Sequence, residues 1–495
     1  MNVLTPLELS NGAAFPLAEA PPMAVEVFRG EVIRECRADA RLAALFGRRL
    51  PSGDLRLQAL LAHDAEGRLT LCGTDLRAGV LEYPALTPEA HEAHWFEREL
   101  AEQFRAHPRG HPWLKPLRAH PVADGPEYPY FAVEGSGIHE VAVGPVHAGV
   151  IEPGHFRFQC DGERVLHLEI HLGYQHRGVE DLLAGARDMR AVALAESIAG
   201  DSSVAHALAH CEAVEALAGT EPPLRAQALR AVALELERVA NHVGDLGALC
   251  NDIGFLPGAS WFGRMRGDAL GLSLALTGNR YGRGFVRPGG VSADLDAGAA
   301  ASLAADAKRL DAEVREVAEV LFSFGQALAR FEGTGPVDYE TAESLGLVGP
   351  AGRASGCDRD VRRDHPSGFY RFTHVPVVVL ESGDVNARAL VRRLEAQHSL
   401  AFIRETLTHL PAGPVLREVR PLPPESASVA LVEAWRGEVV HLLFTGADGS
   451  IERAKVVDPS FHNWMGLAMA LRGGDISDFP LCNKSFNLSY AGHDL

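Results

Sequence analysis

The segment from Leu224 to Leu249 constrains the fold more strongly than any other part of the chain. Its apolar side chains recur at spacings of three and four residues, at positions 229, 232, 236, 239 and 243. This spacing places them on one face of a long helix. A helix with such a face must bury it against other elements, so the segment predicts a helical core.

Other helices and strands are expected around this segment. Helical patterns extend over 178–217, 300–331 and 387–407, and strands are expected over 428–458. Two further strands, Phe156–Cys160 and Glu163–Ile170, flank Asp161-Gly162. This dipeptide favours a tight hairpin turn.

The N-terminal part has a different pattern. Alternating apolar residues predict strands over 25–36 and 55–72, and a helix follows over 89–104. The glycine-containing stretch 122–137 is the best linker candidate. The predicted fold class is α+β, with a small α/β domain over 1–121, a linker over 122–137 and a helix-rich domain over 138–495.

Length, charge and hydropathy exclude several classes of protein. The 495 residues suffice for two or three domains, and 47 basic against 65 acidic residues give a formal net charge of −18. Such acidity disfavours binding to nucleic acid or to bare anionic lipid. No apolar stretch approaches the roughly 20 residues that span a bilayer. The first ten residues contain Glu8 and lack the pattern of a signal peptide. We therefore expect a cytoplasmic chain.

The chain has seven cysteines, which are widely separated, and no CxxC pair. This distribution argues against a disulfide framework, a zinc ribbon and a ferredoxin. The sequence also lacks the glycine motifs of nucleotide-binding loops and the GxSxG motif of serine hydrolases.

Two groups of polar residues have more than one interpretation. Arg238, His242 and Asp245 form a stripe on the Leu224–Leu249 helix, which faces either solvent or a buried polar partner. Five histidines lie within thirty residues, at positions 147, 155, 167, 171 and 176. They could include metal ligands, but no ligand motif accompanies them, so hydrogen-bonded structural histidines are favoured.

Ordered motifs along nearly the whole chain identify a family resemblance. They lie at 144–158 (GPVHAGVIEPGHFRF), 171–180 (HLGYQHRGVE), 203–210 (SVAHALAH), 277–284 (TGNRYGRG), 360–366 (DVRRDHP) and 458–464 (DPSFHNW). They resemble the large subunit of energy-converting, membrane-associated nickel–iron hydrogenases and the related quinone-site subunit of respiratory complex I. The segments 95–100 and 110–112 resemble the small partner subunit, fused to the N-terminus in such complexes.

The resemblance also indicates which metal ligands this chain lacks. In the hydrogenases, four cysteines of an early CGxC and a late DPCxxC motif hold nickel. The corresponding residues here are Ala199, Ser202, Ser460 and Asn463. A methyl group, two hydroxyls and an amide do not replace soft thiolates. We therefore expect no nickel–iron site and no cofactor bound by this chain alone.

The complex I resemblance implies a cavity for a small acceptor. The histidine and tyrosine that contact quinone in complex I fall at Ile151 and His210, so the usual pair is absent. His147, Asp252 and Glu152 resemble retained positions of the cavity wall, and Glu152 resembles the acid that passes protons in hydrogenases. The expected catalytic set is therefore Glu152, His147, His210 and Asp252.

Arg177 and His242 resemble positions beside the terminal iron–sulfur cluster of a neighbouring subunit. The resemblance thus implies a peripheral subunit on the cytoplasmic face of a membrane complex, docked on a small iron–sulfur subunit and on ion-translocating membrane subunits. It would pass electrons from the partner's cluster to a quinone or another small acceptor. Two alternatives remain open: a redox-inactive scaffold, and a different metal or small molecule in the vacated site.

Overall fold

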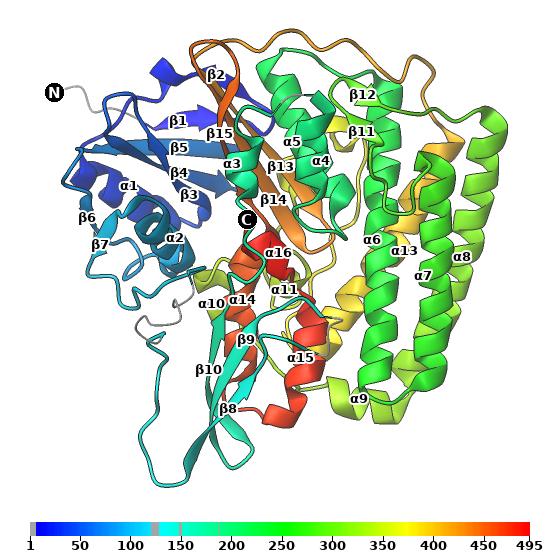
Figure 1. The fold of residues 1–495 in the computed structure, drawn as a ribbon. Helices are drawn as coiled ribbons and strands as arrows, with labels where there is room; N and C mark the ends of the chain where they lie inside the picture. Colours follow the sequence, from blue (N-terminus) through cyan, green and yellow to red (C-terminus); the bar gives the residue numbers. More distant parts are fainter. Residues whose placement is uncertain (1–5, 120–127, 148–150, 187) are drawn as a thin grey trace.

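The computed structural model describes residues 6–119, 128–147, 151–186 and 188–495. It is a mixed helix and sheet protein, in which a sheet-rich N-terminal part packs against a helix-rich remainder (Figure 1). The predicted boundary at 121/122 and the first part of the predicted linker lie outside the described residues. The division into domains therefore stays a prediction.

The N-terminal part is built on a four-stranded antiparallel sheet of order β1-β5-β4-β3. Its strands are β1 (Leu7–Leu9), β3 (Arg41–Arg49), β4 (Leu55–His63) and β5 (Arg68–Leu76). The helices α1 (Val25–Arg37) and α2 (His94–Phe104) accompany it, with the short strands β6 (Glu82–Pro84) and β7 (His107–Arg109). The strand and helix predictions over 55–72 and 89–104 are confirmed.

The strand predicted over 25–36 is wrong, because this segment is helix α1. The residues that it buries include Phe28, Val32 and Ile33. Their spacing of four and five residues places them on one face of a helix, where they pack into the same core as the sheet. The spacing of the buried residues, rather than the apparent alternation of apolar and polar residues, therefore identifies this segment as a helix.

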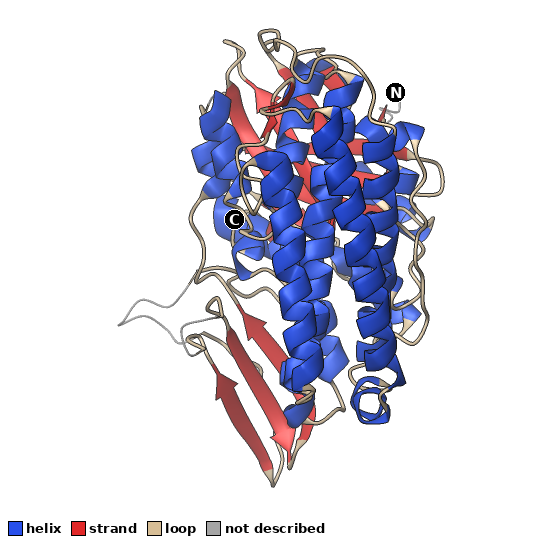
Figure 2. Ribbon diagram, turned by 90° about the vertical axis from the view of Figure 1, so that its right-hand side faces the viewer, coloured by secondary structure: helices blue, strands red, loops and turns tan. Residues whose placement is uncertain are grey.

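Four long helices form a bundle on the other side of the molecule (Figures 1 and 2). They are α6 (Leu224–Asp252), α7 (Leu256–Thr277), α8 (Ala297–Ser323) and α13 (Val385–Thr408). Three correspond to predicted helices, and the short α9 (Gly325–Phe331) follows α8. Helix α7 was not predicted, because four glycines at 258, 263, 267 and 271 weaken its helical pattern.

A second four-stranded antiparallel sheet lies between the bundle and the N-terminal part. It contains the predicted strands as β13 (Ser426–Ala434), β14 (Gly437–Thr445) and β15 (Ile451–Val457). Its fourth strand, β2 (Ala14–Pro16), comes from the N-terminus and pairs with β13. Helix α5 (Ser203–Leu217) packs on this sheet, preceded by α3 (Val179–Leu183) and α4 (Asp188–Glu196).

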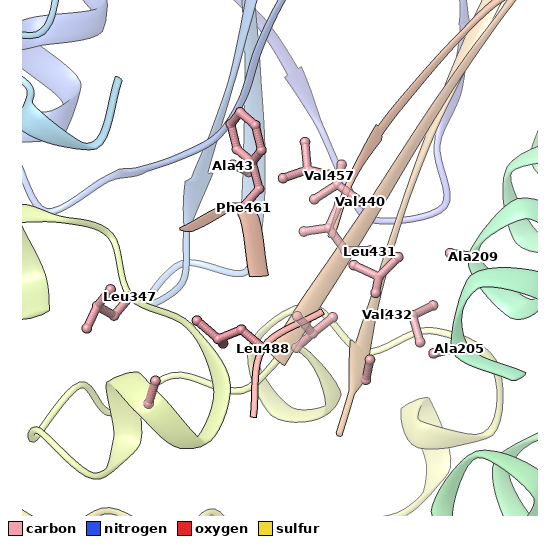
Figure 3. Close-up of a cluster of buried hydrophobic side chains, with 14 of the residues drawn as sticks. Ala43, Ala205, Ala209, Leu347, Leu431, Val432, Val440, Val457, Phe461 and Leu488 are labelled. Carbon is pink, nitrogen blue, oxygen red and sulfur yellow. The ribbon is translucent and has the colours of Figure 1, made fainter. Parts of the chain in front are cut away.

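One hydrophobic core crosses from the N-terminal sheet to the central sheet. Figure 3 shows side chains of β3, β13, β14, β15 and α5 in this cluster, among them Ala43, Leu431, Val440, Val457 and Ala205. A core shared in this way holds the two parts of the chain in one arrangement.

The predicted hairpin is confirmed and forms a projecting three-stranded sheet (Figure 2). Its strands are β8 (Ile138–Val143), β9 (His155–Asp161) and β10 (Arg164–His171), with Gly162 in the left-handed region at the turn. Among the described residues, no helix is long and apolar enough to cross a membrane.

Short helices, strands and turns complete the fold. They are β11 (Val286–Arg287), β12 (Gly290–Val291), α10 (Tyr339–Ser344), α11 (Gly349–Arg353), α12 (Val361–Asp364), α14 (Pro459–Leu471), α15 (Phe479–Phe486) and α16 (Tyr490–His493), with 3₁₀ turns at Leu17–Glu19, His91–Ala93, Gly368–Phe372 and Ile476–Asp478.

Candidate functional site

The four positions where the resemblance expects nickel ligands lie before helix α5 and in the first two turns of helix α14. Ser202 precedes α5, and Ser460 lies in the first turn of α14. The two helices are joined by His206 of α5, whose Nε2 lies 3.1 Å from Oδ2 of Asp458, the N-cap of α14. We call Ala199, Ser202, Ser460 and Asn463 the substituted site.

The substituted site is buried, and its polar atoms have protein partners. The Ser202 hydroxyl lies 3.4 Å from Nη1 of Arg436, and Oγ of Ser460 accepts a bond of 2.9 Å from the backbone of Ser489. The Asn463 amide both donates to and accepts from the backbone of Val348. These groups therefore close the site by packing and hydrogen bonding.

Metal-ligating side chains are not gathered in the part of the chain that the structure describes. No group of three or more His, Cys, Asp or Glu residues there could hold a metal ion. The five histidines of the motif region have other contacts. His176 Nδ1 lies 2.7 Å from the Asp494 carbonyl, His155 Nδ1 lies 3.3 Å from the Gly144 carbonyl, and His171 stacks on Tyr128.

Arg436 supplies the positive charge beside the substituted site. Its guanidinium donates bonds of 2.6 and 2.7 Å to the two carboxylate oxygens of Asp201, and Nε donates to the carbonyl of Asn487. The same group stacks on Trp435, 3.9 Å from the ring centre. Burial opposes the charge, but Asp201 outweighs it and raises the pKa of Arg436. A planar, bidentate arginine thus occupies the edge of this site.

Glu152 is half-buried in the same neighbourhood. Its Oε2 accepts a bond of 3.3 Å from the backbone of Tyr490. Burial raises the pKa of the carboxyl group, with Arg436 opposing and Asp201 adding to the shift. A carboxyl group with a raised pKa exchanges protons closer to neutral pH than an exposed glutamate does.

His147 holds the loop that carries Glu152. Its Nε2 lies 2.9 Å from the carbonyl of Gly154, and its ring packs on Phe156. Ile151, the position that corresponds to the quinone-contacting histidine, is exposed. The structure therefore places Glu152 near Arg436 and Asp201, and His147 on the carbonyl of Gly154, two residues after Glu152.

His210 and Asp252 lie elsewhere. His210 is buried on α5 and lines a cavity of about 420 Å³, and burial lowers its pKa to about 4. Asp252 is an exposed residue at the end of α6, where partial desolvation of its carboxyl group raises the pKa and Lys484 opposes the shift. Among the described residues, no hydrogen bond or ion pair joins either of them to Glu152 or Arg436.

The two residues expected beside a partner's cluster differ in exposure. Arg177 is exposed and donates to the carbonyls of Ser197 and Ile198, directly before Ala199. His242 is fully enclosed, with Nε2 2.8 Å from Oε2 of Glu395, and burial lowers its pKa to about 4. Their role beside a cluster stays a prediction.

The polar stripe on α6 faces buried partners rather than solvent. Arg238 and His242 have no exposed surface, and Asp245 has 3%. Arg238 donates to the Glu433 and Ala434 carbonyls of β13. Asp245 pairs with Arg392 and accepts a bond from Asn487. The interpretation as a solvent-facing stripe is therefore wrong.

The stripe belongs to a network that joins α6, α13 and β13 with the segment 353–362. We call it the buried charge network. Its members are Glu235, Arg238, His242, Arg353, Asp360, Arg362, Glu395 and Glu433. Burial raises the pKa of Glu433 to about 7, whereas arginines outweigh burial and lower the pKa of Glu235 and Asp360 to about 2.

Comparisons with known proteins identify the family to which the chain is similar. The family model of the 49 Kd subunit of respiratory-chain NADH dehydrogenase matches residues 252–429. Formate hydrogenlyase subunit 5 of Escherichia coli is 33% identical over 437 residues, covering 83% of this chain and 77% of the relative. A subunit of the NADH-quinone oxidoreductase of Clostridium beijerinckii is 31% identical over 337 residues, covering 68% of this chain and 91% of the relative.

The chain belongs to the hydrogenase and complex I large-subunit family. The fold agrees. A chain of the membrane-bound sulfane sulfur reductase, an archaeal respiratory membrane complex, superimposes with a TM-score of 0.68 and 27% identity, over 72% of this chain and 99% of that one. The predicted family and the predicted fold class are thus confirmed.

Reasoning from the sequence missed the arginines and acids that hold the site. Arg436 and Asp201 are far apart in the chain, and neither lies in a spacing that predicts a pair. Asp360 lies in a motif that carries the family resemblance, but no role was predicted for it or for Arg353. The sequence feature that could have identified them is a charged residue within an otherwise apolar stretch, because such a residue requires a buried partner.

Proposed function

We propose that this chain is the large peripheral subunit of a membrane-bound redox complex, on its cytoplasmic face, without nickel–iron chemistry. It takes electrons from an iron–sulfur cluster of a small partner subunit and delivers them to a quinone or another small acceptor. Family membership supports the assignment to such a complex. The names of these relatives are a formate hydrogenlyase, an NADH-quinone oxidoreductase and a sulfane sulfur reductase. The acceptor is therefore the part that differs among relatives.

The observation that carries the proposal is the arrangement around the substituted site. Hydroxyl and amide groups replace thiolates there, and Arg436 lies beside them with Asp201. An arginine favours negative charge on a bound group, and the half-buried Glu152 can supply a proton. Reduction of a small neutral acceptor needs both electrons and protons, so a cation next to a protonatable acid suits this chemistry.

The roles of the chain's own residues follow from this placement. Glu152 holds or releases a proton at its carboxyl group. Arg436 orients and stabilises an acceptor that gains negative charge. Arg177 donates to the carbonyls of Ser197 and Ile198, and His242 packs on Trp435, which donates to the Asp201 carbonyl. We assign Arg177 and His242 to the surroundings of the partner's cluster. His147 positions the loop of Glu152.

A test combines metal analysis with an acceptor assay on the intact membrane complex. We expect nickel far below one equivalent per complex, and reduction of an added quinone that falls about 100-fold in Glu152→Gln. Glu163→Gln, an exposed glutamate at the hairpin turn, is the matched control and should retain full activity. Stoichiometric nickel contradicts the first half of the proposal, and equal rates in both variants contradict the role of Glu152.

A second function is favoured by one specific observation. The polar atoms of Ser202, Ser460 and Asn463 are all paired within the chain, which is what a closed structural centre requires. In this case the subunit is a redox-inactive scaffold that couples its ion-translocating partners. A wild-type complex that assembles but reduces neither quinone nor a sulfur acceptor supports the scaffold.

A further inference from the structure

Three histidines form a buried row that leads from the substituted site toward a cavity at the surface. His206 and His210 lie one helical turn apart on α5, and His441 lies on β14, the strand that α5 packs against. All three are buried: the exposed fraction of each is 1% or less. A row of imidazoles in a protein interior is unusual, because each ring carries two polar nitrogens that need partners.

His206 is linked on both sides. Its Nε2 lies 3.1 Å from Oδ2 of Asp458, and its Nδ1 lies 3.2 Å from Nε2 of His441. Both nitrogens of this ring are therefore in hydrogen-bond contact, one with a carboxylate and the other with the next imidazole. An imidazole bonded in this way can accept a proton on one nitrogen and release a proton from the other.

The next link joins His441 to His210. Their ring centroids are 6.0 Å apart at an interplanar angle of 71°. Nδ1 of each ring is buried and has no hydrogen-bond partner among the described residues. A buried nitrogen without a partner is costly, so both atoms would gain from a water that bridges the two rings.

The outer end of the row opens into a cavity. His210 lines a space of about 420 Å³ together with Val214, Pro288, Leu422 and Ile451, and the exposed Asp188 lies at its rim. The inner end is the carboxylate of Asp458, two residues before Ser460 of the substituted site. Water in the cavity can therefore exchange protons with His210, and through the row with the buried interior.

We propose that His210, His441 and His206 form a proton relay between this cavity and Asp458. A proton from cavity water binds one nitrogen of His210 while the other nitrogen releases its proton toward His441. The same exchange passes a proton from His441 to His206 and from Nε2 of His206 to Oδ2 of Asp458, so one proton enters and one arrives. The relay deepens the proposed function, since it would supply protons for acceptor reduction.

The electrostatics of the row suit transfer rather than storage. Burial lowers the pKa of His210 to about 4 and that of His441 well below its ordinary range, so both rings are neutral at rest. At the inner end, His206 and Arg436 outweigh burial and lower the pKa of Asp458, so this carboxylate is ionised at rest and holds an arriving proton only transiently. A proton that enters the row is therefore not retained on its middle members.

The cavity permits a chemical rescue test in the complex. We expect His210→Ala and His441→Leu each to lower acceptor reduction about 100-fold. Added imidazole should restore His210→Ala, whose missing ring borders the cavity, but not His441→Leu, which is enclosed. Pyrrole, a ring of the same size that is not basic, should restore neither. Failure of imidazole to restore His210→Ala, or equal rescue by pyrrole, overturns the relay.

A second measurement separates the relay from the proposed function. Mass spectrometry follows deuterium uptake at the C2 carbon of each histidine ring in the full chain, without any acceptor. His210→Trp, which fills the cavity, should slow uptake at His206 and His441 about tenfold and leave the buried His63 of β4 unchanged. Unchanged uptake at His206 overturns the relay. Slowed uptake in a complex that reduces no acceptor supports the relay while the proposed function fails.

Discussion

At the scale of single residues, Arg353 shows how this chain handles charge in its interior. It has no exposed surface and donates to Glu395 through two nitrogens and to Glu433 through a third. Asp360 lies 3.5 Å from the same group. Removing one partner from such a network leaves the other charges buried without compensation, which costs more than the interaction itself stabilises.

Arg353→Leu should therefore lower the free energy of unfolding by about 3–5 kcal/mol, because Glu395 and Glu433 lose their shared cation. Arg371→Ala is the matched control. Arg371 pairs with Glu221 at the surface, and its loss should change stability by less than about 1 kcal/mol. Urea unfolding followed by circular dichroism measures both. Equal stability of the two variants contradicts this assignment.

Glu212 gives a residue-scale prediction about pH. It lines a cavity of about 370 Å³, and its Oε2 has no hydrogen-bond partner in the described part of the chain. Burial raises the pKa of Glu212 from 4.5 to about 7. The folded state thus binds a proton that the unfolded state releases, so the contribution of Glu212 to stability is fully present below pH 4.5 and is lost as pH rises to 7.

This pKa shift corresponds to about 3 kcal/mol of pH-dependent stability. Glu212→Gln should remove that part of the slope between pH 4.5 and 7, because an amide does not titrate. Thermal unfolding at several pH values checks it, with the exposed Glu163→Gln as the control that keeps the slope. A wild-type slope in Glu212→Gln shows that another group is responsible.

At the scale of elements, the short strand β2 and the turn before it tie the N-terminus to the central sheet. Asn11 donates to the carbonyls of His365 and Leu431 and accepts a bond of 2.8 Å from the backbone of Leu431. Its side chain thus completes the hydrogen bonding of a fully buried residue of β13. The Asn11 amide thus bonds both the N–H and the C=O of Leu431, as the backbone of a neighbouring strand does elsewhere in the sheet.

Asn11→Ala should lower the free energy of unfolding by about 1–3 kcal/mol, because both backbone groups of Leu431 lose their partner in a buried place. Ser10→Ala, at the neighbouring exposed position, should have little effect. Hydrogen exchange of the Leu431 amide gives a local reading of the same loss. Protection that is unchanged in Asn11→Ala contradicts the role given to this side chain.

At the scale of the whole molecule, buried ion pairs join the N-terminal part to the rest. Glu99 of α2 lies 2.7 Å from Nζ of Lys455 on β15, and Arg41 of β3 pairs with Glu438 on β14. The two parts also share the hydrophobic core shown in Figure 3. Each part therefore supplies charges and apolar surface that the other needs.

A fragment of residues 138–495 should consequently not fold alone, because Glu438 loses Arg41, Lys455 keeps only Glu180 of its two carboxylate partners, and the central sheet loses β2. Co-expression with a fragment of residues 1–121 should restore a soluble complex. Gel filtration and circular dichroism of both preparations measure the outcome. A cooperative unfolding transition of the isolated 138–495 fragment would show that the predicted domain is independent.

The sequence by itself determined the family, three of the four long helices, the hairpin strands and the C-terminal strands of the central sheet. Local periodicity and ordered motifs carry that information, since both depend on neighbouring residues. It also determined that no thiolates stand at positions 199, 202, 460 and 463. Only the tertiary structure decided that the polar stripe of α6 is buried, and that Arg436 pairs with Asp201. The same holds for His441, which enters a row between His206 and His210. These contacts join residues far apart in the chain, and they form because buried charges and imidazoles need partners wherever the fold supplies them.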